Sequence, residues 1–182
     1  RSKAKAHDKP EAVLIPVRPK PKLFIIGAVH ITQYLCIFSD EIGFDITVID
    51  PREGFLHHRT FKSAQTITEW PDDYFTKDYL DQGCALVALT HDPKLDDPAL
   101  KPALDSNAFY IGALGSRKTH KNRVERLINA GYSLKNIERI HGPIGLDIGA
   151  RTPAEIAIAI AAELTQAYRL SLSHLQSPSD QI

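Results

Sequence analysis

Several features that mark other protein classes are absent from this sequence. Its 182 residues contain no Met and only two Cys, and Lys and Arg together number 22, the same as Asp and Glu. The sequence has no excess of basic residues that could neutralise phosphates, which argues against a function in binding nucleic acids. No apolar run approaches the ~20 residues that a membrane crossing needs, and the N-terminus lacks the apolar stretch of a signal peptide. The length, with 43% hydrophobic and 24% charged residues, predicts one globular domain and a tail.

The two cysteines and the histidines do not indicate a metal site. Cys36 and Cys84 lie far apart, so we expect reduced, buried thiols rather than a disulfide or a metal pair. His30, His91 and His141 match no zinc spacing. The lack of Met even at the first position indicates a processed chain or part of a longer polypeptide.

The two ends of the chain differ in composition from its middle. Residues 1–21 are rich in Lys, Pro and Ala, and the alternate prolines of "PVRPKPK" favour an extended linker or tail. Within it, Ala12 to Ile15 ("AVLI") can form a short edge strand. Residues 171–182 have the composition of a C-terminal tail. The globular domain is therefore expected over residues 22–170.

Apolar runs and amphipathic stretches alternate through that domain. The expected strands are Lys22–Ala28, Asp45–Asp50, Gln65–Glu69, Cys84–Thr90 and Ala108–Leu114. The expected helices are His30–Ile42, Leu95–Leu104, Lys118–Ala130 and Pro153–Leu170. Thr152, Pro153 and Glu155 give the last helix a capping box with Pro in its first turn. The alternation predicts a three-layer, Rossmann-like α/β fold with a doubly wound, mainly parallel sheet.

Polar and glycine residues follow the strands of this sheet. In open parallel sheets, ligands bind at the carboxyl ends of the strands, so these residues are expected to converge on one site. The candidate cofactor-binding residues are Gly27, His30, Asp50, Arg52, His91, Asp92, Gly112, Gly115, Ser116 and Arg117, with Asp147 and Arg151 in the glycine-rich loop His141–Glu155. We expect no catalytic residue among them.

The stretch "FIIGAVHITQ" raises the question of a dinucleotide ligand. Gly27 begins a G-x-G-x-x-G fingerprint, but Val29 stands in place of its second glycine and would crowd a pyrophosphate. Asp50 lies where an acid holds a ribose diol, yet it can instead pair with the nearby Arg52 or cap a turn. Both interpretations of Asp50 remain open at this point.

The stretch from Gly112 to Arg117 is a second candidate for anion binding. Two glycines, a hydroxyl and a guanidinium precede a helix whose first N–H groups are free. The alternative is a helix cap with a surface arginine. For "THD" (Thr90–Asp92), a His–Asp dyad is disfavoured because neighbouring residues of an extended strand point to opposite faces.

Long motifs in the chain resemble the C-terminal domain of the XdhC/CoxI family, the xanthine dehydrogenase accessory factors. The resemblance covers about Pro16 to Tyr168. Its matching motifs are "GAVHITQ" (where the family has GAGH), "TVIDPR", "LTHDPKLD", "FYIGALGSRKT" and "RIHGPIGLDIGARTPAEIA".

The resemblance implies a cytoplasmic, dimeric protein with a Rossmann-like domain that binds the molybdenum cofactor (molybdopterin), a phosphorylated pterin. It implies help in exchanging an oxo ligand of the cofactor for sulfur and in delivering the cofactor. The partners it implies are a xanthine dehydrogenase-type apoenzyme and a cysteine desulfurase. The cysteine of the family's N-terminal domain has no counterpart here.

The sequence therefore leaves three candidate functions. The favoured one is a maturation factor that binds and delivers the molybdenum cofactor without being a catalyst. The alternatives are an NAD(P)-dependent oxidoreductase, motivated by Gly27 and Asp50, and a nucleotide-sensing regulatory Rossmann domain. Val29 disfavours both nucleotide-based alternatives.

Overall fold

A six-stranded parallel sheet in the order β3-β2-β1-β4-β5-β6 runs through the computed structural model, which describes residues 19–75 and 80–174. Its strands are β1 (Lys22–Ile26), β2 (Asp45–Ile49), β3 (Ala64–Ile67), β4 (Cys84–Ala88), β5 (Tyr110–Ala113) and β6 (Ile140–His141). The order reverses between β1 and β4, which is the doubly wound arrangement of Rossmann-type domains. The predicted fold class is confirmed.

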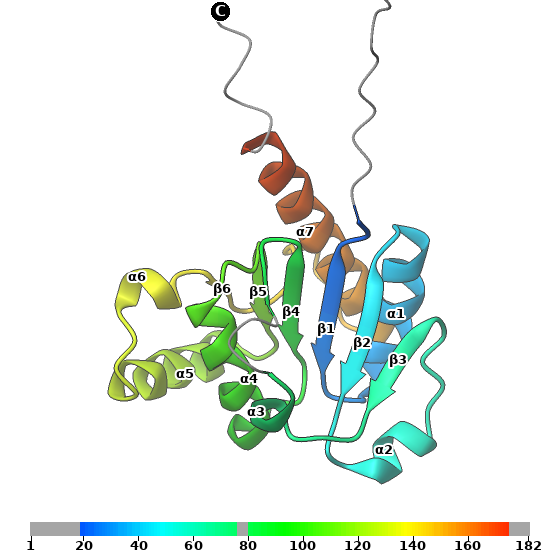
Figure 1. The fold of residues 1–182 in the computed structure, drawn as a ribbon, viewed down its shortest axis with the longest axis horizontal. Coiled ribbons are helices and arrows are strands. Elements are labelled where there is room, and N and C mark those ends of the chain that lie inside the picture. Colours follow the sequence, from blue (N-terminus) through cyan, green and yellow to red (C-terminus); the bar gives the residue numbers. More distant parts are fainter. Residues whose placement is uncertain (1–18, 76–79, 175–182) are drawn as a thin grey trace, which may run out of the picture.

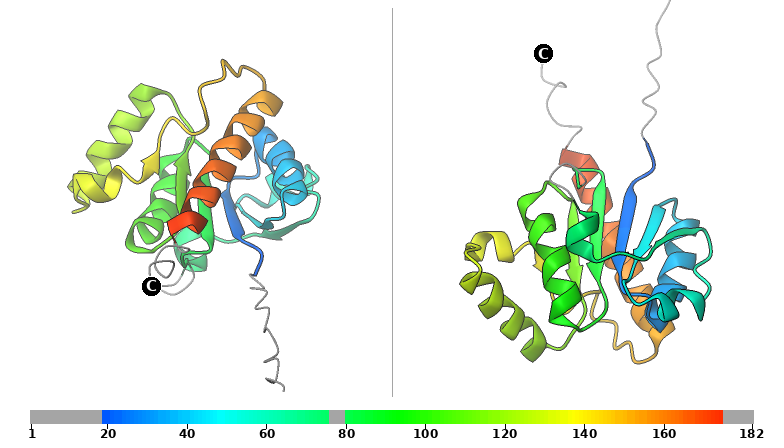
Figure 2. Two further views of the ribbon diagram at one scale, coloured as in Figure 1. Left: turned by 90° about the horizontal axis from the view of Figure 1, so that it is seen from above. Right: turned by 60° about the horizontal axis from the view of Figure 1, so that its bottom comes forward.

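Helices cover both faces of the sheet (Figures 1 and 2). They are α1 (His30–Glu41), α2 (Glu53–His57), α3 (Pro71–Tyr74), α4 (Pro93–Asp105), α5 (Arg117–Asn129), α6 (Leu134–Ile137) and α7 (Pro153–His174). α1 and α7 pack together on one face, and α4 packs on the other beside α3 and α5. Alternate residues of β1 supply the two cores, since Phe24 faces the α4 side and Ile25 faces the α1–α7 side.

The structure differs from the predicted elements mainly at their ends. α7 continues to His174, so residues 171–174 are helical rather than part of a tail. Short elements that the sequence pattern did not indicate appear as α2, α3, α6 and the two-residue strand β6. The edge strand expected at residues 12–15 lies outside the described residues, as does most of the expected linker.

The predicted start of the last helix is confirmed in detail. The Glu155 carboxylate accepts hydrogen bonds from the backbone N–H of Thr152 at 3.0 Å and of Arg151 at 2.7 Å, and the Thr152 hydroxyl accepts one from the Glu155 N–H at 3.3 Å. This reciprocal pair satisfies N–H groups that a helix end leaves free. It fixes where the loop before α7 ends.

The cysteine prediction also holds. Cys36 in α1 and Cys84 at the start of β4 are buried thiols, and within the described residues neither forms a disulfide. Burial raises the pKa of the Cys36 thiol to about 12 and that of Cys84 to about 11, so both are poor nucleophiles at neutral pH. Across residues 19–75 and 80–174, the structure has no helix with the length and apolarity that a membrane crossing demands, and no cluster of metal-ligating side chains.

Candidate functional site

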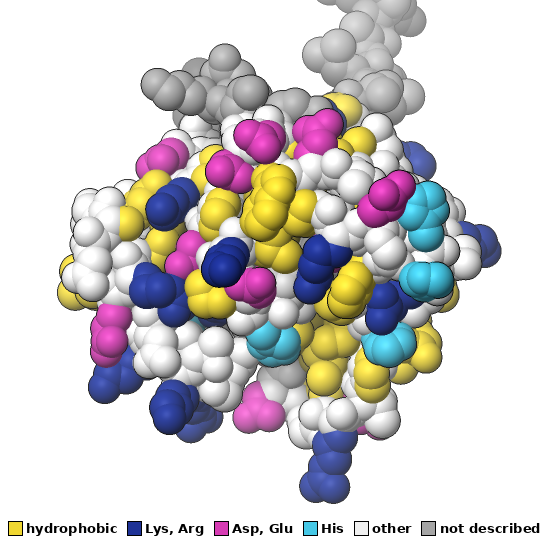
Figure 3. All heavy atoms as spheres, turned by 90° about the horizontal axis from the view of Figure 1, so that it is seen from below, with side chains coloured by type: hydrophobic (Ala, Val, Ile, Leu, Met, Phe, Trp, Pro, Cys, Tyr) yellow, Lys and Arg dark blue, Asp and Glu magenta, His cyan; other side chains and the backbone are white. Residues whose placement is uncertain are grey.

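All strands of the sheet end at the same edge, the lower one in Figure 1. Seen from below, this edge carries basic, acidic and histidine side chains interspersed with hydrophobic ones (Figure 3). Most of the predicted site residues follow strand ends here. Gly112, however, lies inside β5, fully covered, and a Cβ at this position would approach Ile144 Cγ1 to 2.8 Å. Its lack of a side chain serves packing against the loop after β6.

At the end of β2, the carboxylate of Asp50 is fully engaged by the protein. Its oxygens accept hydrogen bonds from the Arg52 side chain (Nε and Nη2, both 2.8 Å), the Arg52 N–H (3.0 Å) and the Ala28 N–H (2.8 Å). Burial opposes the charge on Asp50, but these hydrogen bonds outweigh it and hold the pKa of the carboxyl below its usual value. Of the two interpretations of Asp50, the structure shows the local pair with Arg52.

The turn after β1 is shaped by a close approach to β4. Gly27 has φ +107, and a Cβ there would lie 2.6 Å from Thr90 Cγ2, so only glycine fits without a shift. Val29 follows in an extended conformation and packs partly against the core on the α1–α7 side. His30 is the first residue of α1 and is exposed. The turn is therefore tightly built against its neighbour strand.

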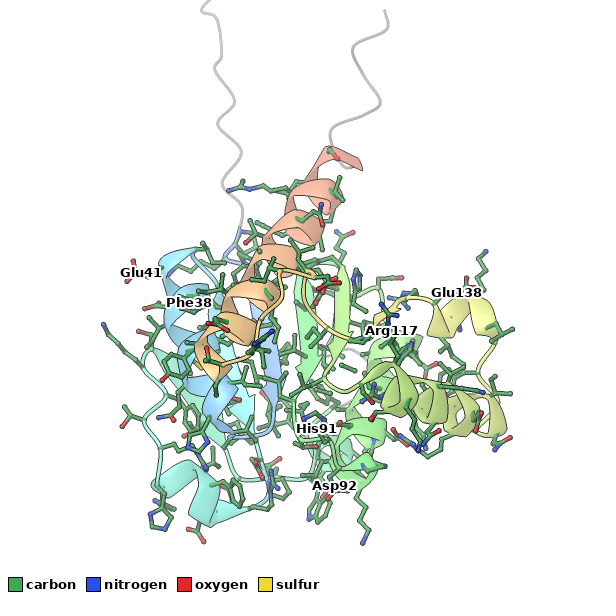
Figure 4. All side chains as sticks on the ribbon, turned by 180° about the vertical axis from the view of Figure 1, so that it is seen from behind. Phe38, Glu41, His91, Asp92, Arg117 and Glu138 are labelled. Carbon is green, nitrogen blue, oxygen red and sulfur yellow. The ribbon has the colours of Figure 1, made fainter. Side chains whose placement is uncertain are left out.

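At the end of β4, the two neighbours of His91 are bonded to the protein. Thr90 Oγ1 donates to Asp96 Oδ1 at 2.6 Å, and Asp92 Oδ1 accepts from the Lys94 N–H at 2.9 Å, which caps α4. Asp92 thus serves the helix start, and no hydrogen bond joins it to the His91 ring among the described residues. The expected reason, an extended strand, does not apply here, because β4 ends at Ala88 and His91 has a positive φ. His91 itself is exposed and has φ 61 (Figure 4 labels His91 and Asp92).

A cavity of about 430 Å³ opens beside the start of α5. It is lined by Leu114, Gly115 and Arg117 on one side, by residues 143–150 of the glycine-rich loop on another, and by Ile156 and Ala159 of α7. Volumes of about 300–1,000 Å³ are usual for small-molecule sites. Three predicted site residues, Gly115, Arg117 and Asp147, therefore meet in one cavity, and Arg151 follows directly after the part of the loop that lines it.

The start of α5 leaves anion-binding groups free. Ser116 caps the helix, since its Oγ accepts a hydrogen bond from the Thr119 N–H at 3.1 Å. Within the described residues, the backbone N–H groups of Arg117 and Lys118 have no hydrogen-bond partner, and the exposed Arg117 side chain forms no ion pair. Such free N–H groups together with a guanidinium are suited to a phosphate.

Glu163 of α7, which the sequence interpretation did not single out, holds the cavity wall. Its carboxylate accepts hydrogen bonds from Tyr110 Oη at 2.6 Å and from the Gly145 N–H at 2.8 Å, and lies 3.1 Å from His141 Nδ1. Burial opposes the charge on Glu163, but these partners outweigh it and lower the pKa of the carboxyl. The available signal was a single acid between Ile156 and Leu164 in an otherwise apolar helical stretch.

The predicted site is thus divided between two parts of one edge. Gly27, Asp50, Arg52 and Asp92 belong to a part whose polar groups are bonded to each other and to the backbone, whereas Arg117 and its neighbours border an open cavity. Another cavity, of about 480 Å³, lies at the opposite edge between residues 19–22, residues 81–83 and the end of α7. Ligands of open parallel sheets bind at the carboxyl edge, which favours the cavity at Arg117.

Fold and site together define a Rossmann-type α/β domain with a ligand cavity at the carboxyl edge of its sheet. A family model described as the XdhC Rossmann domain matches residues 23–164. The chain belongs to this family, as the motifs indicated.

Two relatives carry names that refer to xanthine dehydrogenase or to the molybdenum cofactor. A probable xanthine dehydrogenase subunit of Bacillus subtilis (strain 168) is 31% identical over 151 residues, 82% of this chain and 44% of that protein. The molybdenum cofactor insertion chaperone PaoD of Escherichia coli (strain K12) is 34% identical over 85 residues, 47% of this chain and 27% of that protein.

A solved structure has the same fold. The crystal structure of a xanthine dehydrogenase from Bacillus halodurans superposes with a TM-score of 0.72 at 30% identity, covering 89% of this chain and 46% of that one. The present chain therefore spans less than half the length of these relatives.

Proposed function

We propose that this domain binds the molybdenum cofactor and aids its sulfuration and its insertion into a xanthine dehydrogenase-type molybdenum hydroxylase. A cysteine desulfurase is the proposed source of sulfur, and a homodimer the proposed assembly. The observation that carries the proposal is the cavity of about 430 Å³ that joins Arg117 to the glycine-rich loop. The names of the relatives support the choice of cofactor and target.

The groups around the cavity fit the phosphate of a phosphorylated pterin. Arg117 would bind the phosphate through two N–H groups, and the free N–H groups at the start of α5 would add the positive end of the helix dipole. Asp147, in the opposite wall, carries a carboxylate that can accept hydrogen bonds from the amino and ring N–H groups of a pterin. Leu114, Ile144 and Ile156 supply apolar surface for its ring.

The chain's own role is to hold and orient this ligand, and the bound cofactor would supply the metal centre on which the target's chemistry depends. The walls that would orient it are fixed: Ile144 N–H donates to the Ala113 carbonyl at 3.2 Å, and Gly145 is held by Glu163. Walls held in this way position a ligand with little adjustment.

The geometry at the ends of β1 and β2 argues against a dinucleotide ligand. Asp50 would have to release Arg52 before it accepted a ribose diol, because each of its oxygens already accepts two hydrogen bonds. Val29 retains a side chain where a pyrophosphate needs close backbone approach. The oxidoreductase and nucleotide-sensing alternatives both depend on this region.

Binding titrations of the purified protein with molybdenum cofactor, NAD(H) and NADP(H) test the proposal. Charge-assisted hydrogen bonds contribute about 1.5–3 kcal/mol, so Arg117→Ala should weaken cofactor binding roughly tenfold or more. Arg169→Ala removes an exposed arginine near the end of α7 and should leave binding unchanged. Val29→Gly should also change it little, and circular dichroism checks that each variant folds.

Each outcome selects among the three functions. If Arg117→Ala binds the cofactor like the parent, the phosphate is not held at α5. Tight nicotinamide binding with turnover of a small alcohol or acid would establish the oxidoreductase instead. Nucleotide binding without turnover would establish the sensing domain.

A further inference from the structure

His91 stands at the carboxyl end of β4 in an unfavourable backbone conformation. Its φ of 61 lies in the left-handed region, which few non-glycine residues adopt, although His, Asn and Asp occur there more often than other residues. Among the described non-glycine residues, only Ser63, in the turn before β3, shares a positive φ. A residue persists in this region only when its surroundings hold it there.

The residues on both sides of His91 are held by the Thr90 hydroxyl. This hydroxyl donates to Asp96 Oδ1 at 2.6 Å and accepts from the Asp92 N–H at 3.0 Å, and the Thr90 N–H also lies 3.3 Å from Asp96 Oδ1. The chain therefore turns at His91 between two bonded residues.

A buried ion pair fixes Asp96 in turn and connects it to the cavity. Asp96 and Arg123 are each 1% exposed, and Arg123 Nη2 lies 3.6 Å from Asp96 Oδ2. Arg123 Nη2 also donates to the Leu114 carbonyl at 2.9 Å, directly before Gly115 in the cavity wall. The end of β4 and the cavity beside α5 thus share one buried support.

The His91 ring interacts electrostatically with Asp96 but is not held by a hydrogen bond. His91 is exposed, and no residue of the described chain forms a hydrogen bond with its ring. Residues held in sparsely populated backbone conformations cluster at ligand-binding positions. His91 and Arg117, both labelled in Figure 4, follow the neighbouring strands β4 and β5. His91 does not line the cavity at Arg117, so a ligand whose phosphate is held at Arg117 would extend beyond this cavity to reach the end of β4.

Resting on the proposed function, we infer that His91 contacts the bound molybdenum cofactor through its imidazole, and that Thr90 and Asp96 are positioning residues that hold it there. Because glycine tolerates a positive φ, replacing His91 by glycine distinguishes a ligand-binding role from a structural one. If His91 served stability, its replacement by glycine would lower stability; if it serves the ligand, the same replacement removes strain and loses binding.

The first test compares His91→Gly with Ser63→Gly, which relieves the same backbone conformation at the opposite edge of the sheet. Neither variant should lower the melting temperature, because glycine adopts a positive φ without strain. His91→Gly should weaken the binding of molybdenum cofactor by about tenfold, whereas Ser63→Gly should bind like the parent.

The second test is a double-mutant cycle with Thr90→Val, which removes the hydroxyl and keeps the shape. Thr90→Val should weaken cofactor binding in the parent but add nothing in the His91→Gly background, because its effect passes through His91. If His91→Gly binds like the parent while Arg117→Ala does not, the inference fails and the proposed function stands. If the parent binds no cofactor, both fail.

Discussion

The backbone N–H of Gly145 donates a hydrogen bond of 2.8 Å to the carboxylate of Glu163, eighteen residues further along the chain. The same carboxylate accepts from the hydroxyl of Tyr110, whose ring lies 4.6 Å from that of His141. The side chain of Glu163 in α7 therefore links β5, β6 and the cavity wall.

Glu163→Ala should lower the free energy of unfolding by about 2–4 kcal/mol, because the Tyr110 hydroxyl and the Gly145 N–H each lose an acceptor in a buried setting. Urea denaturation measures the change. Glu125→Ala is the control: Glu125 is exposed on α5, so its replacement should stay within about 0.5 kcal/mol of the parent. Equal losses in the two variants would contradict the role given to Glu163.

The same residue should make stability depend on pH. Burial alone would raise the pKa of Glu163, but hydrogen bonds from His141, Tyr110 and Gly145 outweigh it and lower the pKa below its usual value. The unfolded chain therefore takes up this proton at a higher pH than the folded one does. The contribution of Glu163 is complete above the unfolded pKa and is lost as the pH falls through the folded value.

Urea titrations at a series of pH values measure this dependence. As the pH falls through the usual pKa of a glutamate, about 4.3, and below it, the parent should lose stability more steeply than Glu163→Gln, which keeps an acceptor but has no proton to gain. Other acids, including Asp50, titrate in both proteins and cancel in the comparison. Parallel curves would show that Glu163 is not the group responsible.

Gly27→Ala should destabilise the protein more than Gly43→Ala does. Both glycines have a positive φ (+107 and +91), but only the Cβ at Gly27 meets another group, Thr90 Cγ2 at 2.6 Å. The shared backbone term is about 1–2 kcal/mol, and the collision at Gly27 adds about 1–3 kcal/mol. Thermal unfolding of the two variants measures the difference.

A second substitution separates the collision from the backbone strain. Thr90→Ser removes the methyl group and keeps the hydroxyl that donates to Asp96. Introduced into Gly27→Ala, it should recover part of the lost stability, whereas in Gly43→Ala it should recover none. Absence of recovery would mean that the turn after β1 is not limited by this contact.

The features of the fold that follow from local pattern were predictable from the sequence. Continuous apolar runs indicated β1 and β4, and the Thr152–Glu155 capping box placed the start of α7 at Pro153. β6 was missed because two residues carry no periodicity; its pairing with β5 depends on contacts distant in sequence. α7 extends beyond the predicted end at Leu170, because residues 171–174 include no glycine or proline that would end the helix.

The sequence predicted that the candidate site lies at the carboxyl edge of the sheet. It did not predict which residues of that edge are bonded to each other and which border an open cavity. Strand ends placed Asp50 and Arg117 at the same edge of the sheet, yet the sequence does not tell which of them is already paired. The Asp50 carboxylate is paired with the side chain of Arg52 two residues further on, which is one of the two interpretations that the spacing allowed. Buried Arg123 and Asp96 were missed because their pairing joins two helices and leaves no motif.

The attachment of the glycine-rich loop to α7 affects the entropy of binding. Glycines free in a loop lose more backbone freedom than other residues when a ligand orders them. Here Gly145 is already held by Glu163, and a Cβ at its position would lie 3.1 Å from Ala159 and Ile160, so its freedom is lost on folding. A ligand entering the cavity therefore immobilises little backbone at this wall, and its affinity benefits from order that the core of the domain has already established.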